Sequence, residues 1–173
     1  MKLELLEDLY IEELRDLYDA EKRLSRTLLR MSKAASAEDL KMAFSFHRKQ
    51  TKEQIRRLEQ IFKRVGESPE GKKCKAMAGL SAEAKDLVAE EAEPEILDAG
   101  LIVAAQKMEH YEIAGYGSLA SYAKLLGFEQ DAALLHQTLQ EEKNTDEKLN
   151  LMAKNINIDA AEGETAVKAA QQA

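Results

Sequence analysis

Long amphipathic stretches restrict the fold of this chain more than any other feature of its sequence. Between residues 3 and 32, apolar side chains recur every three or four positions over about seven helical turns. Helix breakers are rare, because the 2 prolines, Pro69 and Pro94, both lie outside such stretches and helix-forming residues dominate elsewhere. The 173 residues therefore predict one all-α domain that is large enough to bury a core.

Local signals divide the chain into four long helices. Ser36 with an acid three positions later is a capping pattern, and Pro94 suits the first turn of a helix. Gly66 and Gly127 suit the left-handed backbone that ends a helix. We expect helices over about residues 3–32, 36–66, 95–126 and 129–154.

The stretch between the second and third long helices differs from the other connections. It begins with the loop-forming sequence of residues 67–71, continues with a basic cluster and predicts a short helix over about residues 81–91. Because it is too long for a tight turn, it predicts a crossover to the far end of a four-helix bundle. We expect residues 1–157 to form the bundle and residues 158–173, which lack an apolar stripe, to form a flexible tail.

Each long helix carries a polar residue within its apolar stripe, near the middle of the helix. These residues are Glu21, His47, Glu112 and Glu142, with Thr51 beside His47 on the second helix. A carboxylate in a core costs several kcal/mol unless a proton, a cationic partner or a metal ion neutralises it.

The spacing to the turns puts these residues at matching levels. In an antiparallel hairpin with its turn near residue 35, Glu21 lies opposite residues 47–51, and in one with its turn near residue 127, Glu112 lies opposite residue 143. Both pairs are about 20 Å from their turns at the helical rise. Bundles with a di-iron or di-manganese centre place one Glu on each of two helices and a Glu-x-x-His pair on each of the others in this way. Carboxylates with an imidazole favour iron or manganese as the metal.

The motifs also resemble a known family. Residues 18–22 (Tyr-Asp-Ala-Glu-Lys), 47–54, 74–80, 109–114 (Glu-His-Tyr-Glu-Ile-Ala) and 141–146 match the YciF-like family of ferritin-like stress proteins in order and spacing, over about residues 5–155. The resemblance implies a ferritin-like, rubrerythrin-type bundle with a short fifth helix, a homodimer and a dinuclear metal site.

The chain departs from the family at two positions. Gln50 stands where the family often has an acid, and Asp146 stands where the fourth helix usually offers a histidine. With one imidazole, the site would hold metal more weakly or hold fewer ions. Glu109 lies beside the stripe of its helix as a ligand or a solvated acid. The candidate metal ligands are Glu21, His47, Gln50, Glu109, Glu112, Glu142 and Asp146.

Two further residues of ligand-forming types, His110 and Cys74, are not expected to bind the metal. His110 points away from Glu112 around the helix, which favours a surface or dimer-interface position. The single cysteine, Cys74, cannot form an internal disulfide and is expected to be packed rather than reactive.

Composition limits the partners. The net charge of −7 argues against general nucleic-acid binding and against an anionic membrane surface, and no apolar run is long enough to span a bilayer. The acidic N-terminal segment does not have the pattern of a signal peptide, so we expect a cytoplasmic protein.

Three functional hypotheses follow. The first is a stress protein that binds two iron or manganese ions and acts on dioxygen or peroxide, with Glu112 and Glu142 bridging the ions and Glu21 and His47 holding one of them. The second is a non-enzymatic bundle whose core acids are paired or protonated and which serves as an oligomeric or protein-interaction module. The third, iron storage, requires a hollow multimer for which the sequence gives no indication.

Overall fold

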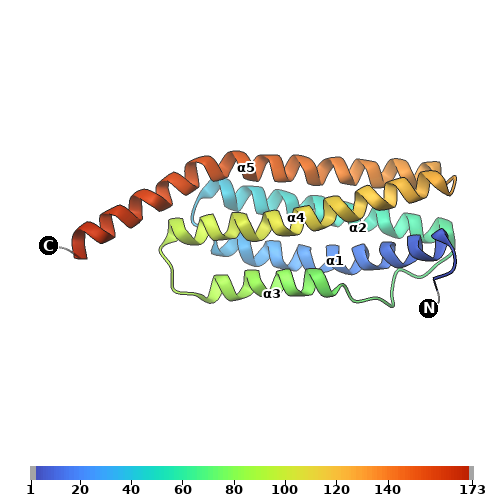
Figure 1. Cartoon of the computed structure of the whole chain (residues 1–173), viewed down its shortest axis with the longest axis horizontal. Coiled ribbons are helices and arrows are strands. Elements are labelled where there is room, and N and C mark those ends of the chain that lie inside the picture. Colours follow the sequence, from blue (N-terminus) through green and yellow to red (C-terminus); the bar gives the residue numbers. More distant parts are fainter. Residues whose placement is uncertain (1–2, 172–173) are drawn as a thin grey trace.

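The computed structural model describes residues 3–171, with side chains described to residue 163, and this part of the chain forms five helices (Figure 1). They are α1 (Leu6–Ala34), α2 (Glu38–Val65), α3 (Lys75–Ala89), α4 (Pro94–Leu125) and α5 (Glu129–Gln171). The prediction of an all-α bundle with four long helices and one short helix is confirmed.

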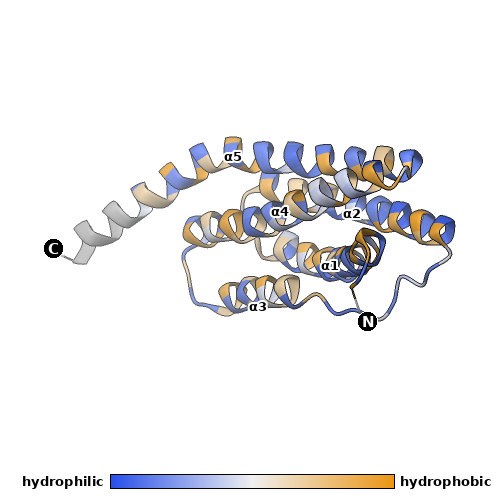
Figure 2. Ribbon diagram, turned by 45° about the vertical axis from the view of Figure 1, so that its right-hand side comes forward, coloured by the Kyte–Doolittle hydropathy of each residue, from blue (hydrophilic) through white to orange (hydrophobic). Residues whose placement is uncertain are grey.

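The bundle consists of two antiparallel hairpins packed side by side. Helices α1 and α2 form one hairpin, α4 and α5 form the other, and α1 also packs against α4 and α2 against α5 (Figure 1). The predicted crossover is present: α3 lies outside the four-helix core against α1 and α4, and returns the chain to the end of the bundle where α4 begins. Hydrophobic and hydrophilic residues alternate around the bundle helices (Figure 2).

One glycine permits a close approach within this packing. A Cβ atom added to Gly115 of α4 would lie 2.9 Å from Cδ2 of Leu17 on α1, closer than real Cβ contacts. Its absence lets α1 and α4 pack tightly beside the polar residues of the core.

The start of α2 is capped by a different residue from the one that the sequence indicated. The sequence indicates Ser36 as the capping residue. In the structure the N-cap residue is Ala37, whose side chain forms no capping hydrogen bond. Instead, the backbone N–H groups of Ser36 and Ala37 donate to Asp98 Oδ1 and Oδ2, at 2.8 and 2.7 Å. Because Asp98 is on α4, this cap is a contact between the two hairpins.

Helix α3 begins six positions earlier than predicted, at Lys75 rather than near Ser81. The Cys74 side chain accepts a hydrogen bond from Met77 N–H at 3.3 Å, and Cys74 N–H donates to Asp19 Oδ2 at 2.8 Å. Met77 is fully buried, so the first turn of α3 is fixed by packing as well as by the cap.

Helix α5 continues to Gln171, well beyond the predicted end near residue 154, and its last turns extend past the other helices (Figure 1). The structure therefore gives residues 158–171 a helical backbone, and the flexibility of this tail stays a prediction. No helix in the described part of the chain is both long enough and apolar enough to cross a membrane.

Candidate metal centre

Three helices bring four ionisable side chains to one buried point. His47 comes from α2, Glu109 and Glu112 from α4, and Glu142 from α5. One ligand atom of each lies within 4.8 Å of the others, and all four side chains are buried. Glu109, which lay beside its predicted stripe, is fully inside this group, because the core-facing surface of α4 is broader than a single stripe.

The polar atoms of this cluster are poorly satisfied within the described residues. Both carboxylate oxygens of Glu109 and of Glu112 form no hydrogen bond there, and the same holds for the two ring nitrogens of His47. His47 Nε2 lies 3.0 Å from Glu109 Oε1 and 3.7 Å from Glu142 Oε2, so the imidazole is held between two acids without hydrogen-bond geometry. Unpaired buried oxygens cost free energy, and a divalent cation at their centre would remove that cost.

Helix α1 adds Glu21 to the same region. Glu21 is fully buried, and its Oε1 accepts a hydrogen bond from the hydroxyl of Tyr116 on α4. A core tyrosine thus holds one of the candidate carboxylates. Burial raises the pKa of Glu21 to about 8, and the Glu109 charge adds to the increase, while the Tyr116 hydrogen bond and the charges of His47 and Arg57 oppose it.

The other cluster acids are shifted in the same direction. Burial and the charges of neighbouring acids raise the pKa values of Glu112 and Glu142 well above the usual range of a glutamate. Burial alone would lower the pKa of His47, but the charges of Glu109 and Glu21 outweigh it and raise that pKa. Each acid therefore makes ionisation of its neighbours costly, as expected where several carboxylates share a site built for a cation.

No lysine or arginine of the described residues forms an ion pair with Glu21, Glu112 or Glu142, as would be required if these were ordinary buried salt bridges. Arg57 binds the neighbouring Glu141 instead, through Nη1 and Nη2 at 2.6 and 2.8 Å. Within the described residues, the basic side chain that lies against the cluster is therefore His47, 3.0 Å from Glu109 and 3.7 Å from Glu142.

Gln54 is a site residue that the sequence-based selection missed. It is fully buried, and its Nε2 donates to Glu142 Oε1 and, at 3.1 Å, to Glu141 Oε2. Its position seven residues after His47, on the same face of α2, was the available signal.

Three candidate ligands lie outside the four-residue group: Glu21, described above, Gln50 and Asp146. Gln50 is partly exposed and its side chain interacts with His47. Asp146 is also partly exposed, and its Oδ1 lies 3.4 Å from Nε2 of His110 while its Oδ2 accepts from Asn150 at 3.1 Å. His110 itself is 68% exposed, which confirms the predicted surface position.

A separate polar network lies between α1, α3 and α4. The Tyr111 hydroxyl donates to Asp16, and Cys74 Sγ lies 3.1 Å from the Tyr111 hydroxyl oxygen. Cys74 is buried, and burial raises the pKa of its thiol. The prediction that Cys74 is packed is confirmed.

Comparison with known proteins places this chain in a family. Residues 5–162 match a family model described as a domain of unknown function, DUF892. The chain is 44% identical over 159 residues to the protein YciF of Escherichia coli (strain K12), a match that covers 91% of this chain and 96% of YciF.

Solved structures agree with the fold. The crystal structure of the E. coli stress protein YciF superposes with a TM-score of 0.86 at 44% identity and covers 89% of this chain and 98% of YciF. The protein YcfI from Rhodopseudomonas palustris superposes with a TM-score of 0.83 at 40% identity, covering 86% and 95% of the two chains. A Xanthomonas campestris protein, at 18% identity and a TM-score of 0.75 over 93% and 99% of the chains, shares the fold. With the predicted bundle, its motifs and these similarities in agreement, the chain belongs to the DUF892 family, which it shares with YciF, and has the ferritin-like bundle fold.

Proposed function

We propose that this protein binds two iron or manganese ions in its buried carboxylate cluster and reacts with dioxygen or peroxide in stress protection. The observation that carries the proposal is the convergence of His47, Glu109, Glu112 and Glu142, whose ligand atoms lie within 4.8 Å of one another. Three buried acids with one imidazole, and no lysine or arginine paired with Glu112 or Glu142 among the described residues, suit a hard divalent cation.

The residues have distinct proposed roles. Glu112 and Glu142 would hold the ions together with His47 and Glu109, because ligand atoms of these four side chains lie within 4.8 Å of one another. Glu21, which is fully buried on α1, would add a further carboxylate. The Tyr116 hydroxyl positions the Glu21 carboxylate, and Gln54 positions Glu142.

The protein contributes orientation and exclusion of water around this site. When bound, iron or manganese would supply redox chemistry and open coordination positions for dioxygen or peroxide. Complete burial of Glu21, Glu109 and Glu112 strengthens their interaction with a cation. The Tyr116 hydroxyl donates a hydrogen bond at the Glu21 side.

Stress protection, assembly and location are carried into the proposal by the family. The E. coli relative is a stress protein, and we assign the same physiological setting to this chain by similarity. We further propose a cytoplasmic homodimer, which sedimentation of the purified protein at several concentrations would test.

One observation favours the alternative of a non-enzymatic bundle. The raised pKa values of Glu112 and Glu142 mean that a proton can neutralise these acids in place of a metal. In that case the cluster is a structural feature, and the protein holds no metal after purification.

Elemental mass spectrometry distinguishes the two functions. The wild-type protein, purified without chelator and reconstituted anaerobically with ferrous iron or manganese, is compared with His47→Ala and Glu112→Ala. We expect about two ions per chain in the wild type and a loss of most of this metal in both variants. Glu147→Ala, which changes an exposed acid on α5, is the matched control and is expected to keep the metal.

Two results would contradict the proposal. Absence of metal in the reconstituted wild type would favour the non-enzymatic bundle, and full metal retention in Glu112→Ala would show that the ions bind elsewhere. Loss of metal in Glu147→Ala as well would indicate adsorption to surface acids.

A further inference from the structure

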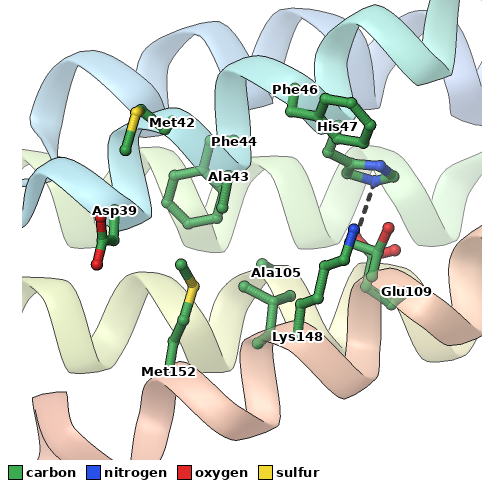
Figure 3. A pocket seen from close by; sticks show the side chains of 12 residues that line it. Asp39, Met42, Ala43, Phe44, Phe46, His47, Ala105, Glu109, Lys148 and Met152 are labelled. Atoms are coloured by element: carbon green, nitrogen blue, oxygen red, sulfur yellow. Dashed lines mark ion pairs between the residues drawn. The ribbon is translucent and has the colours of Figure 1, made fainter.

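An apolar cavity of about 310 Å³ lies between α2, α4 and α5 and reaches the carboxylate cluster (Figure 3). His47 and Glu109 lie at one end of it and Asp39 at the other. The wall between these ends is apolar, from the side chains of Met42, Ala43, Phe44, Ala105, Leu149 and Met152. The cavity is therefore a path from the surface to two candidate metal ligands.

Two of the large apolar side chains that line the cavity are exposed. Met42 and Phe46 on α2 are 61% and 57% exposed, and Phe46 lies beside His47 (Figure 3). The Lys148 ammonium lies 5.2 Å from the centre of the Phe46 ring, and no ion pair of Lys148 is found among the described residues.

The cavity has acidic and basic side chains in equal number along its length. Asp39 is exposed at the outer end, Lys148 lies along the side nearer to Glu109, and the buried ends of His47 and Glu109 face each other at 3.0 Å. An anion entering the cavity meets Glu109, and a cation meets Lys148 and His47. Neither sign of charge is favoured, whereas apolar surface is offered along the whole length.

We propose that this cavity binds a small, uncharged, largely apolar organic molecule, with one end of that molecule against His47 and Glu109. Its volume is at the lower end of the range for small-molecule sites, which admits a medium-length alkyl chain or a single ring system. That such a molecule is a substrate of the metal centre rests on the proposed function. Its binding in the cavity does not, because the apolar walls exist without metal.

The methionines of the chain provide a built-in test. Met42 and Met152 line the cavity, whereas Met31 and Met77 are fully buried elsewhere in the core. The full-length protein, labelled with ¹³C at the methionine methyl groups, is titrated with octanol in its metal-free form. We expect saturable chemical-shift changes at Met42 and Met152 and unchanged signals from Met31 and Met77.

A filled cavity provides the second test. Ala43→Phe places a ring in the cavity from a partly exposed position on α2, and we expect it to weaken octanol binding about tenfold or more. The matched control is Ala132→Phe, a partly exposed alanine on α5 outside the cavity, which is expected to keep the wild-type affinity. Circular dichroism shows whether each variant is folded, and the wild-type titration decides the matter if Ala43→Phe is not.

The chemical class is tested with octanoate and octylamine. We expect both ions to bind more weakly than octanol, because each must lose hydration against apolar walls. Tighter binding of octanoate or octylamine would overturn the assignment to an uncharged molecule. Shifts spread over all methionines, or none at Met42 and Met152, would overturn the site itself.

Two further outcomes separate this proposal from others. If the Met42 and Met152 signals change on dilution of the protein without octanol, a second copy of the chain fills the cavity and the proposal is wrong. Saturable shifts at these two residues in a protein that fails to bind iron or manganese would support the cavity and contradict the proposed metal function.

Discussion

Glu109 and Glu112 each lower the stability of the metal-free protein. Glu109 and Glu112 are fully buried, and none of their carboxylate oxygens forms a hydrogen bond within the described residues. Such groups destabilise a fold unless a ligand satisfies them. Their presence together is better explained by binding than by packing.

Replacement of one cluster acid is therefore expected to stabilise the metal-free protein. Glu112→Gln keeps the shape of the side chain and removes its charge, so at pH 8 it should raise the free energy of unfolding by about 1–3 kcal/mol. Urea denaturation in the presence of a chelator measures this change. Glu147→Gln, an exposed change on α5, should shift it by less than about 0.5 kcal/mol. A destabilised Glu112→Gln would mean that the carboxylate is structural.

At the scale of the helices, the sequence predicted a helix or a helix end correctly where neighbouring residues determine it. The four long helices, the crossover and the Gly66 and Gly127 ends followed from periodicity and from end-capping residues. The errors arose where distant residues decide: α2 is capped by Asp98 from another helix, and Cys74 starts α3 earlier than periodicity indicates. Spacing from the turns likewise anticipated the level of the cluster.

The inward direction of each side chain was harder to predict than its level. Gln54 and Glu109 enter the site through the relative rotation of packed helices, which sequence spacing does not specify. Asp146, selected because it stands where the family's fourth helix usually has a histidine, lies 3.4 Å from the exposed His110, and its role as a ligand stays a prediction. The apolar cavity has no sequence signature at all, because it is bounded by three helices and lies between them.

The Asp98 cap gives a prediction at the same scale. Asp98→Ala leaves the N–H groups of Ser36 and Ala37 without their acceptors and should cost about 1–2 kcal/mol of stability. Urea denaturation followed by circular dichroism measures the loss. Asp86→Ala, at an exposed site on α3, is the matched control. Equal stabilities of the two variants would show that water replaces Asp98 without cost.

For the whole molecule, the cluster predicts an unusual dependence of stability on pH. The folded protein holds protons on Glu21, whose pKa is raised from 4.5 to about 8, and on Glu112 and Glu142, whose pKa values are also raised. Since the folded state then binds more protons than the unfolded state above about pH 4.5, the free energy of unfolding should fall as pH rises toward 8. The raised pKa of His47 acts in the same direction.

Metal should reverse this trend. Binding requires deprotonated carboxylates, so the stabilisation by iron or manganese grows with pH. Thermal denaturation between about pH 5 and about pH 8, with chelator and with metal, compares the two slopes. Glu112→Gln should flatten the slope of the metal-free protein. Parallel slopes with and without metal would show that the cluster does not bind the ion.

The Asp98 cap between the two hairpins also affects how the chain folds. Asp98 belongs to the second hairpin, yet it accepts the backbone N–H groups that begin the second helix of the first. The turn of the α1–α2 hairpin therefore gains its capping hydrogen bonds only when α4 has docked. Although the two hairpins have matching polar levels, this exchange of contacts makes each a poor autonomous folding unit, and residues 1–66 alone should refold without the cooperativity of the intact chain.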